Sequence, residues 1–289
     1  MIVFTDARCQ QYESPGHPER PFRVQATEAF LKSVMDLNIE WRTPTLATSL
    51  SLERAHRSEH LDRVEKAAEA FDGDTPAYEG IWDYSRRATG AALDALEVVL
   101  KDKGVNAFSL MRPPGHHATA ARAMGFCYLN HVATTALEAA SKGLEKVAIL
   151  DFDVHHGNGT EAILKGKPGF QFCSVHQHPC YPGTGTENVG GNCFNYPAAP
   201  RMPREKYRDL ISRAMERLVR WQPNLLILSA GFDAYARDPI AQESLEAEDF
   251  EWVGQLIRGF EGPKLSVLEG GYSNDLPELI AAYLSGLEG

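Results

Sequence analysis

Short, continuous apolar runs recur along the chain, and each of them opens directly into a polar segment. Four such runs cover residues 105–111, 147–150, 224–230 and 264–270. Buried parallel strands have this appearance, because both of their faces are covered and apolar positions therefore do not alternate with polar ones. We predict that the four runs are strands of one sheet.

Stretches with helical spacing of apolar residues separate these runs. They cover residues 21–37, 86–101, 130–142 and 207–221. Alternating strands and helices imply right-handed crossovers and a three-layer α/β/α fold with a single, mainly parallel sheet. The 289 residues contain no linker, internal repeat or low-complexity tract. We therefore expect a single domain over residues 1–289.

The segment VAILDFDVHHGN (147–158) carries the most informative polar residues. If the strand stays extended, Asp151, Asp153 and His155 point the same way, because side chains two positions apart share a face. Polar groups crowded in this manner need a partner for their charge. A divalent metal is the natural partner, and Asp with His in a partly open site fits catalytic zinc. The alternative is a polar loop after a buried strand.

The other runs also end in residues suited to chemistry. His116 and His117 follow the first run, Asp233 follows the third, and Tyr272 follows the last. In open α/β sheets, ligands bind outside the carboxyl ends of the strands. The sequence therefore predicts that these side chains meet at one edge of the sheet.

Composition narrows the possible partners. The net charge of −10 argues against broad nucleic-acid binding and suits a cationic or neutral substrate. We find no apolar run of membrane-spanning length and no signal-peptide pattern in MIVFTDARCQ, so we expect no membrane partner. The five cysteines form no C-x-x-C pair, which fits reduced thiols and a cytoplasmic location.

Six motifs, in this order, resemble those of the histone deacetylase family, which belongs to the arginase–deacetylase superfamily of metal-dependent hydrolases. The resemblance extends from about His17, in GHPERPFR, to Tyr272, and QHPCYPGTG together with Asn158 is closer to the class II and bacterial branch. It implies the arginase–deacetylase fold and a metal-dependent deacetylase catalytic domain. The motifs are RPPGHHA (112–118), GFCYLNHVA (125–133), DFDVHHGNGT (151–160), SVHQHPCYPGTG (174–185), SAGFDA (229–234) and LEGGY (268–272).

The resemblance assigns the metal ligands to Asp153, His155 and Asp233. Three protein ligands leave a position for water and for the substrate carbonyl. The metal implied is Zn²⁺, with Fe²⁺ as the alternative. It would lower the pKa of the bound water and polarise the acyl oxygen.

The same resemblance assigns the groups that move protons. His117 matches the proton shuttle and His116 the deeper, supporting histidine, and histidine suits both roles near neutral pH. Asp151 is expected to orient His116 and Asn158 to orient His117. Tyr272, after two glycines, matches the tyrosine that donates a hydrogen bond to the tetrahedral oxyanion.

Further positions match the family's substrate tunnel and a structural ion. Arg23 either lines an internal product channel or is a salt-bridging residue of its helix. Hard oxygen ligands suit an ion such as structural K⁺. The residues implied for K⁺ are Asp151, Asp153, His155, Ser174 and Val175, and those implied for substrate binding are Asp74 at the rim, Gly125, Phe126 and Tyr181 in the walls, and Ile240 in the floor or wall.

These residues favour a zinc-dependent deacylase that hydrolyses an N-acetyl or other N-acyl amide of a lysine-like amine. The partner expected is therefore an acylated amine, and the oligomeric state stays open. The first alternative is an acetylpolyamine amidohydrolase. Polyamine-selective family members can carry an acidic gatekeeper at the tunnel mouth, and the uncharged Gln242 near that position mildly favours an acyl-lysine or other small amide instead. Arginase-like chemistry would need a D-x-H-x-D pattern, but Gly157 follows the histidines. A non-catalytic acyl-lysine binding module would be expected to lack Tyr272 or a metal ligand.

Overall fold

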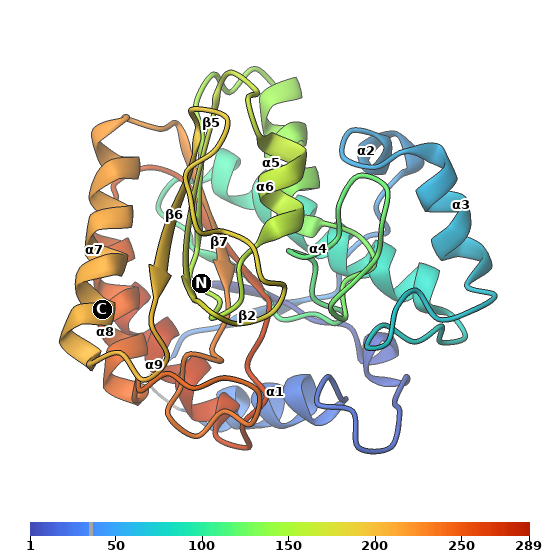
Figure 1. The fold of residues 1–289 in the computed structure, drawn as a ribbon, viewed down its shortest axis with the longest axis horizontal. Coiled ribbons are helices and arrows are strands. Elements are labelled where there is room, and N and C mark those ends of the chain that lie inside the picture. The colour runs from blue at the N-terminus through green and yellow to red at the C-terminus, as the bar shows by residue number, and fades with distance from the viewer. Residues whose placement is uncertain (35–36) are drawn as a thin grey trace.

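The centre of the computed structural model, which describes residues 1–34 and 37–289, is a sheet of eight parallel strands (Figure 1). The strand order is β2-β1-β3-β8-β7-β4-β5-β6, and every registered pair is parallel. The predicted fold class is therefore confirmed. The strands are β1 (Ile2–Phe4), β2 (Glu40–Arg42), β3 (Ala107–Ser109), β4 (Val147–Asp151), β5 (Phe170–Gln177), β6 (Cys193–Ala198), β7 (Leu225–Ala230) and β8 (Lys264–Leu268).

The four predicted strands form the middle of this sheet. They are β3, β8, β7 and β4, which are neighbours in space, and every residue of β3, β4 and β7 is buried. Their continuous apolar sequence follows from this position, because helices cover both faces. The strands that we did not predict are the outer ones, and β2 alternates between exposed and half-buried residues.

Helices form the two outer layers (Figure 1). One face of the sheet packs against α4 (Ile81–Lys101), α5 (His131–Ser141) and α6 (Asn158–Leu164). The opposite apolar cluster contains residues from α1 (Phe22–Ser33), α7 (Arg204–Arg220), α8 (Ala247–Arg258) and α9 (Leu276–Glu288). Outside the layer of α4 and α5 lie the short helices α2 (Ser49–Glu53) and α3 (Ser58–Lys66), and a 3₁₀ turn covers Ala7–Gln10.

The predicted helices differ from the observed ones mainly at their ends. α1 ends at Ser33, short of the predicted residue 37, and residues 35–36 of that prediction lie outside the described residues. α4 begins earlier than predicted, directly after Gly80. The φ of Gly80 is 78°, a left-handed conformation that glycine adopts readily and that does not continue a helix toward the N-terminus. α7 begins at Arg204, after Pro203.

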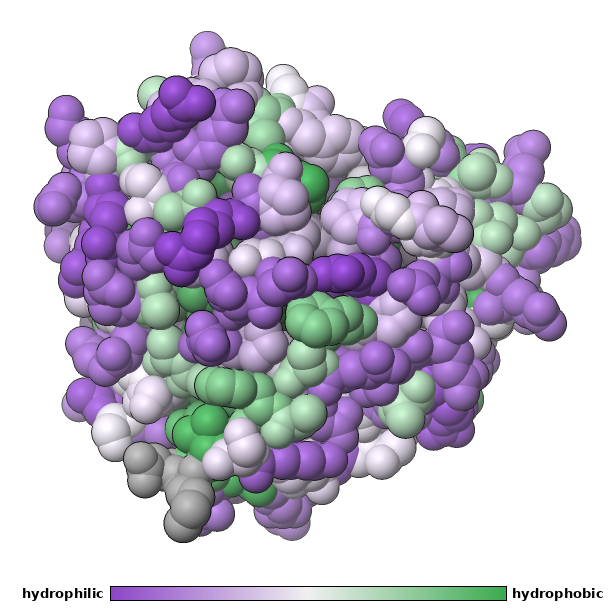
Figure 2. Space-filling view, turned by 90° about the horizontal axis from the view of Figure 1, so that it is seen from below, coloured by the Kyte–Doolittle hydropathy of each residue, from purple (hydrophilic) through white to green (hydrophobic). Residues whose placement is uncertain are grey.

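The described helices include none that is both long and apolar enough to span a membrane. Figure 2 views the molecule from below, the side toward which the arrows of β6 and β7 point in Figure 1. Charged and polar side chains dominate this face, and the apolar groups between them are small. The loops that follow the strands lie at this side, so this is the carboxyl edge at which we expect a site.

Candidate active site

Strand β4 brings Asp151 to the carboxyl edge, but the strand ends there. Asp153 and His155 lie in the turn that follows, so the expectation that an extended strand would carry all three side chains to one spot is wrong. Asp151 instead faces His116, with its Oδ2 at 3.0 Å from Nδ1 of that histidine. Asp153 and His155 turn toward Asp233, which follows β7.

Asp153, His155 and Asp233 form a buried cluster whose ligand atoms all lie within 4.8 Å of one another. His155 Nδ1 lies 3.1 Å from Asp153 Oδ1 and 3.1 Å from Asp233 Oδ2. Burial, and then the adjacent Asp153, raise the pKa of Asp233 above its usual range. Two carboxylates and an imidazole that converge in a buried place fit a divalent cation, because a cation offsets their repulsion.

Backbone N–H groups fix the carboxylates of this cluster. Asp153 Oδ2 accepts from the N–H of Gly270 at 2.7 Å, and Asp233 Oδ1 accepts from the N–H of Val154 at 2.8 Å. In each carboxylate one oxygen is therefore held by the backbone while the other faces His155. Such partners orient metal ligands and are part of how a metal site works.

The two adjacent histidines, His116 and His117, have different partners. His117 Nδ1 lies 2.8 Å from Asn158 Oδ1, whereas His116 Nδ1 faces Asp151. Burial lowers the pKa of His117 well below its usual value, and the adjacent His116 lowers it further. Burial also acts on His116, but Asp151 and Asp153 outweigh it and raise the pKa of His116 to about 10.

These partners determine the protonation of the pair. An amide oxygen can only accept, so Nδ1 of His117 donates to Asn158 and Nε2 of the neutral ring keeps its lone pair. Asp151 and Asp153 favour the protonated form of His116, because they raise its pKa. The site therefore combines one imidazole that can take up a proton with one whose carboxylate neighbours favour a positive charge.

A cavity of about 370 Å³ leads to the cluster and the histidine pair. His116, His117, His155 and Tyr272 line it. The predicted tunnel residues that line it are Asp74, Gly125, Phe126, Tyr181 and Ile240, and the lining residues to which we gave no tunnel role are His17, Pro18, Pro114, Cys127 and Cys180. These five residues lie within the quoted motifs, but their place in a motif carries no signal that separates a tunnel wall from a packed loop. Ile240 lines the cavity, whereas Gln242 donates its backbone N–H to Gln177 Oε1.

Tyr272 is 7% exposed and directly follows two glycines, Gly270 and Gly271, at which the local structure requires glycine. A Cβ on Gly270 would lie 2.0 Å from Asp233 Oδ2, and Gly271 has a φ of 118°. Arg23, predicted to line a channel or to form a salt bridge, donates from Nε to the Gly271 carbonyl at 2.7 Å and its guanidinium lies 4.7 Å from the centre of the Tyr272 ring. The glycines let the chain pass close to Asp233 just before the tyrosine, and Arg23 packs against the tyrosine ring.

Two of the predicted K⁺ residues, Asp153 and His155, belong to the buried cluster, and a third, Asp151, ends the strand before it. Ser174, on β5, pairs in register with Asp151, and its Oγ lies 2.9 Å from Nδ1 of His176. Val175 follows on the same strand, where its carbonyl lies 3.5 Å from the hydroxyl of Tyr207. The assignment of an ion to these oxygens stays a prediction.

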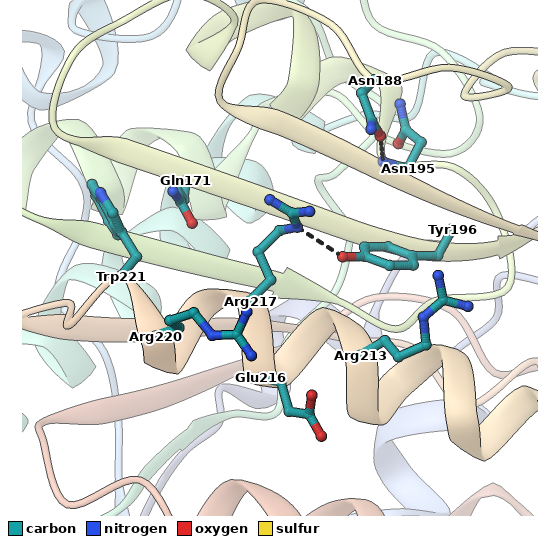
Figure 3. A pocket seen from close by; sticks show the side chains of 9 residues that line it. All are labelled: Gln171, Asn188, Asn195, Tyr196, Arg213, Glu216, Arg217, Arg220 and Trp221. Atoms are coloured by element: carbon teal, nitrogen blue, oxygen red, sulfur yellow. Dashed lines mark hydrogen bonds between the residues drawn. The ribbon is translucent and has the colours of Figure 1, made fainter.

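A second, larger cavity of about 540 Å³ lies beside β5, β6 and α7 (Figure 3). Arg217 crosses it and donates from Nε to the Tyr196 hydroxyl at 3.0 Å. It shares no lining residue with the catalytic cavity, and no histidine or cysteine lines it. The smaller cavity, which reaches the cluster of Asp153, His155 and Asp233 and the two adjacent histidines, is therefore the candidate active site.

Comparisons with known proteins agree with this geometry. The family model of the histone deacetylase domain matches residues 17–287. A histone deacetylase-like amidohydrolase of Pseudomonas aeruginosa is 36% identical, over 89% of this chain and 73% of that protein. Acetylpolyamine amidohydrolase 1 of the same organism is 34% identical, over 76% of this chain and 66% of that protein. The crystal structure of the HDA15 HD domain superposes with a TM-score of 0.92 at 31% identity, covering 100% of this chain and 91% of that one.

Proposed function

This chain belongs to the histone deacetylase family and is a hydrolytic enzyme, and we propose that it is a zinc-dependent deacylase acting on N-acetyl or other N-acyl amides of lysine-like amines. The observation that carries the proposal is the convergence of Asp153, His155 and Asp233 at a cavity that His117 and Tyr272 also line. Amide hydrolysis needs a polarised carbonyl, a base for water and an acid for the leaving amine. This cavity offers groups for each need.

Asp153, His155 and Asp233 would hold the metal, with Zn²⁺ as the proposed ion and Fe²⁺ as the alternative. A bound ion of this kind lowers the pKa of water and polarises the acyl oxygen. The hydrogen bonds from Gly270 and Val154 hold the carboxylates in place before any ligand arrives.

We assign the proton transfer to His117. Its neutral ring takes the proton of the attacking water on Nε2, while Asn158 holds the proton on Nδ1. The resulting imidazolium gives that proton to the nitrogen of the leaving amine. His116 stays protonated beside Asp151 and contributes a positive charge to the field around the reacting carbonyl.

The remaining assignments concern the substrate. The Tyr272 hydroxyl donates to the tetrahedral oxyanion. Phe126 and Tyr181 enclose the alkyl stem of the acylated amine, with the backbone of Gly125 between them, because an uncharged stem favours an apolar channel. Asp74 holds the substrate at the rim and Ile240 limits the space near the acyl group. K⁺ is proposed as a structural ion at Asp151, Asp153, His155, Ser174 and Val175.

An acetylpolyamine amidohydrolase is the second candidate, because a relative with that name is 34% identical. Both activities would use the same metal and histidines and would differ in the amine that reaches the cavity. Steady-state assays with acetyl-lysine peptides, longer acyl-lysine peptides and acetylated polyamines separate the candidates. We expect the highest kcat/KM on an acyl-lysine substrate; a preference for acetylated polyamine would favour the second candidate.

The metal assignment has its own test. Asp233→Ala removes one of two carboxylates from the cluster, so elemental analysis should show strong loss of a metal that wild type holds at one ion per chain. Deacylation should be lost with it. Retention of the full metal content after removal of Asp153, His155 and Asp233 together would refute the site.

A further inference from the structure

Asp238 lies behind the catalytic cavity, in the segment between β7 and α8, and its two carboxylate oxygens bind two different parts of the cavity wall. Oδ2 accepts from the N–H of Tyr272 at 2.7 Å, and Oδ1 accepts from the N–H of Ile240 at 3.0 Å. Tyr272 and Ile240 both line the cavity. Asp238 is 7% exposed and does not line the cavity, so it can act on a substrate only through these two residues.

The backbone before Tyr272 is already held at nearly every polar group. Gly270 donates its N–H to Asp153 Oδ2, and its carbonyl accepts from the N–H of Phe232 at 3.1 Å. Arg23 binds the carbonyls of the residues on either side of Gly270. The bond from Asp238 continues this series to Tyr272 itself, and it comes from the segment between β7 and α8 that also supplies the N–H of Phe232.

The Tyr272 ring leaves little freedom to correct a displaced backbone. Phe126 packs edge-on against it at 5.7 Å between ring centres, and the Arg23 guanidinium covers it at 4.7 Å. A tyrosine side chain turns about two torsions only, so the position of the Tyr272 backbone decides where its hydroxyl lies. A hydrogen-bond donor helps a transition state only when it lies close to the developing charge.

We propose that Asp238 is a positioning residue for deacylation, which fixes Tyr272 for contact with the oxyanion and joins it to the Ile240 wall. The inference rests on the proposed role of Tyr272 and adds the group that holds this residue in place. One carboxylate binds both backbone N–H groups, so the oxyanion donor and the wall near the acyl group keep a fixed mutual distance. An asparagine could not do the same, because it has one acceptor oxygen where aspartate has two.

The test is a double-mutant cycle of Asp238→Asn and Tyr272→Phe. Asp238→Asn should lower kcat by about 10- to 100-fold, the range expected for misplacement of a catalytic group, and should leave the metal content unchanged. In the Tyr272→Phe background the same change should alter kcat by less than about twofold, because the hydroxyl that it positions is already absent. KM should change little in both backgrounds, since the substrate stem does not touch Asp238.

Asp275→Asn is the matched control. Asp275 also accepts hydrogen bonds in this region, from the Tyr235 hydroxyl at 2.8 Å and from Arg237 at 3.1 Å, but it does not line the cavity. Its replacement should leave kcat at the wild-type value. If Asp238→Asn does not fold, Asp238→Glu replaces it in the cycle, because glutamate keeps both oxygens and displaces them by one methylene.

Three outcomes would overturn the inference. A loss of kcat of the same size in both backgrounds would show that Asp238 acts through general stability or through the metal rather than through Tyr272. An unchanged kcat in the Asp238 variant would show that the hydrogen bond does not position anything. If Tyr272→Phe itself had wild-type kcat, the proposed role of Tyr272 as oxyanion donor would fail, and this inference would fail with it. The single variant Tyr272→Phe therefore tells a failure of the proposed oxyanion donor apart from a failure of Asp238 as its positioning residue.

Discussion

Two of the buried groups of histidines in this molecule differ in their partners, because one of them faces carboxylates and the other does not. In the candidate active site, His116 and His155 lie against Asp151, Asp153 and Asp233. The other group, His56, His60 and His131, lies near α2, α3 and α5 and binds backbone and hydroxyl groups.

The difference shows what decides the charge of a buried imidazole. Burial lowers the pKa in both groups and brings it to about 3 for His56 and about 4 for His131. Carboxylate partners reverse this effect and raise the pKa of His116 to about 10. Burial alone therefore makes a neutral, structural histidine, and a charged one needs an anionic neighbour.

The neutral group also supports the charged one. His131 Nε2 donates to the Pro113 carbonyl at 3.0 Å, in the loop that carries His116 and His117. His56 Nδ1 donates to the Thr119 carbonyl at 3.0 Å, on the other side of that pair. Backbone carbonyls accept these hydrogen bonds without any charge on the ring, so the loop is held in place without placing further charge beside the metal site.

Replacement of His117 or His116 by alanine should have the largest effect on kcat. His117→Ala should lower kcat by about 10²–10⁴-fold, because the base and the acid are lost together. His116→Ala should be milder and should shift the pH profile, because it removes a supporting charge. Single-turnover and steady-state rates at several pH values measure both. If His116→Ala proved the more damaging, the two roles would be reversed.

Removal of the Tyr272 hydroxyl should have the next largest effect. Tyr272→Phe should lower kcat by about 10²–10³-fold, as the loss of one oxyanion donor does. Metal content should stay at the wild-type level, because the hydroxyl is not one of the ligand atoms of the cluster. Elemental analysis beside steady-state kinetics makes the comparison, and wild-type turnover in the variant would contradict the assignment.

Asn158→Asp sharpens the comparison of the two groups, because it gives His117 the kind of partner that His116 has. A carboxylate stabilises the imidazolium, so the pKa of His117 should rise from its lowered value. The acidic limb of kcat/KM reports the base in the free enzyme, and this limb should move to higher pH. A limb that does not move would show that it does not belong to His117.

The smallest expected effect is the contribution of His56, in the neutral group, to the pH dependence of the free energy of unfolding. His56 accepts from the N–H of Asn130 at 2.9 Å through Nε2, so a second proton has no acceptor. Because the pKa of about 3 in the folded state is below the unfolded value, the unfolded state binds the proton first as pH falls. The free energy of unfolding should therefore decrease by about 2 kcal/mol between pH 7 and pH 5 from this residue.

Urea unfolding of wild type and His56→Gln at the two pH values measures this contribution. The variant should be less stable at pH 7, since a buried partner is lost, but its stability should depend less on pH. The same pH dependence in both proteins would show that His56 is not neutral in the folded state. His60→Gln provides a comparison within the same group, because burial also lowers the pKa of His60.

Much of the site could be predicted from the sequence because strand ends in a parallel sheet deliver their residues to one edge. The runs before Asp151 and Asp233 are continuous and apolar, and they became the adjacent strands β4 and β7. The motifs added the pairing of His116 with Asp151 and of His117 with Asn158, and the structure places both pairs within hydrogen-bond distance.

Asp238 and Glu269 show why other parts could not be predicted. Asp238 is a single acidic residue in a loop, where a turn former is the common interpretation, and Glu269 lies near the end of the predicted strand 264–270. Glu269 accepts the N–H groups of Gly115 and His116 at 2.7 and 3.0 Å, a contact between segments more than a hundred residues apart. Such contacts depend on how loops from different strands meet, and local periodicity carries no information about that. The outer strand β2 was missed for a similar reason, because it is short and half-exposed.

The position of β8 has a consequence for the synthesis of the protein. β8 is the last strand along the chain, yet it lies between β3 and β7. A nascent chain that has not yet exposed residues 264–268 lacks the strand that pairs with both β3 and β7, and we expect the unpaired edges of those two strands to favour contact with other unfinished chains. Insertion of β8 closes both edges at once. Tyr272 follows this strand directly, so the step that protects the nascent chain from aggregation also delivers the last proposed catalytic group.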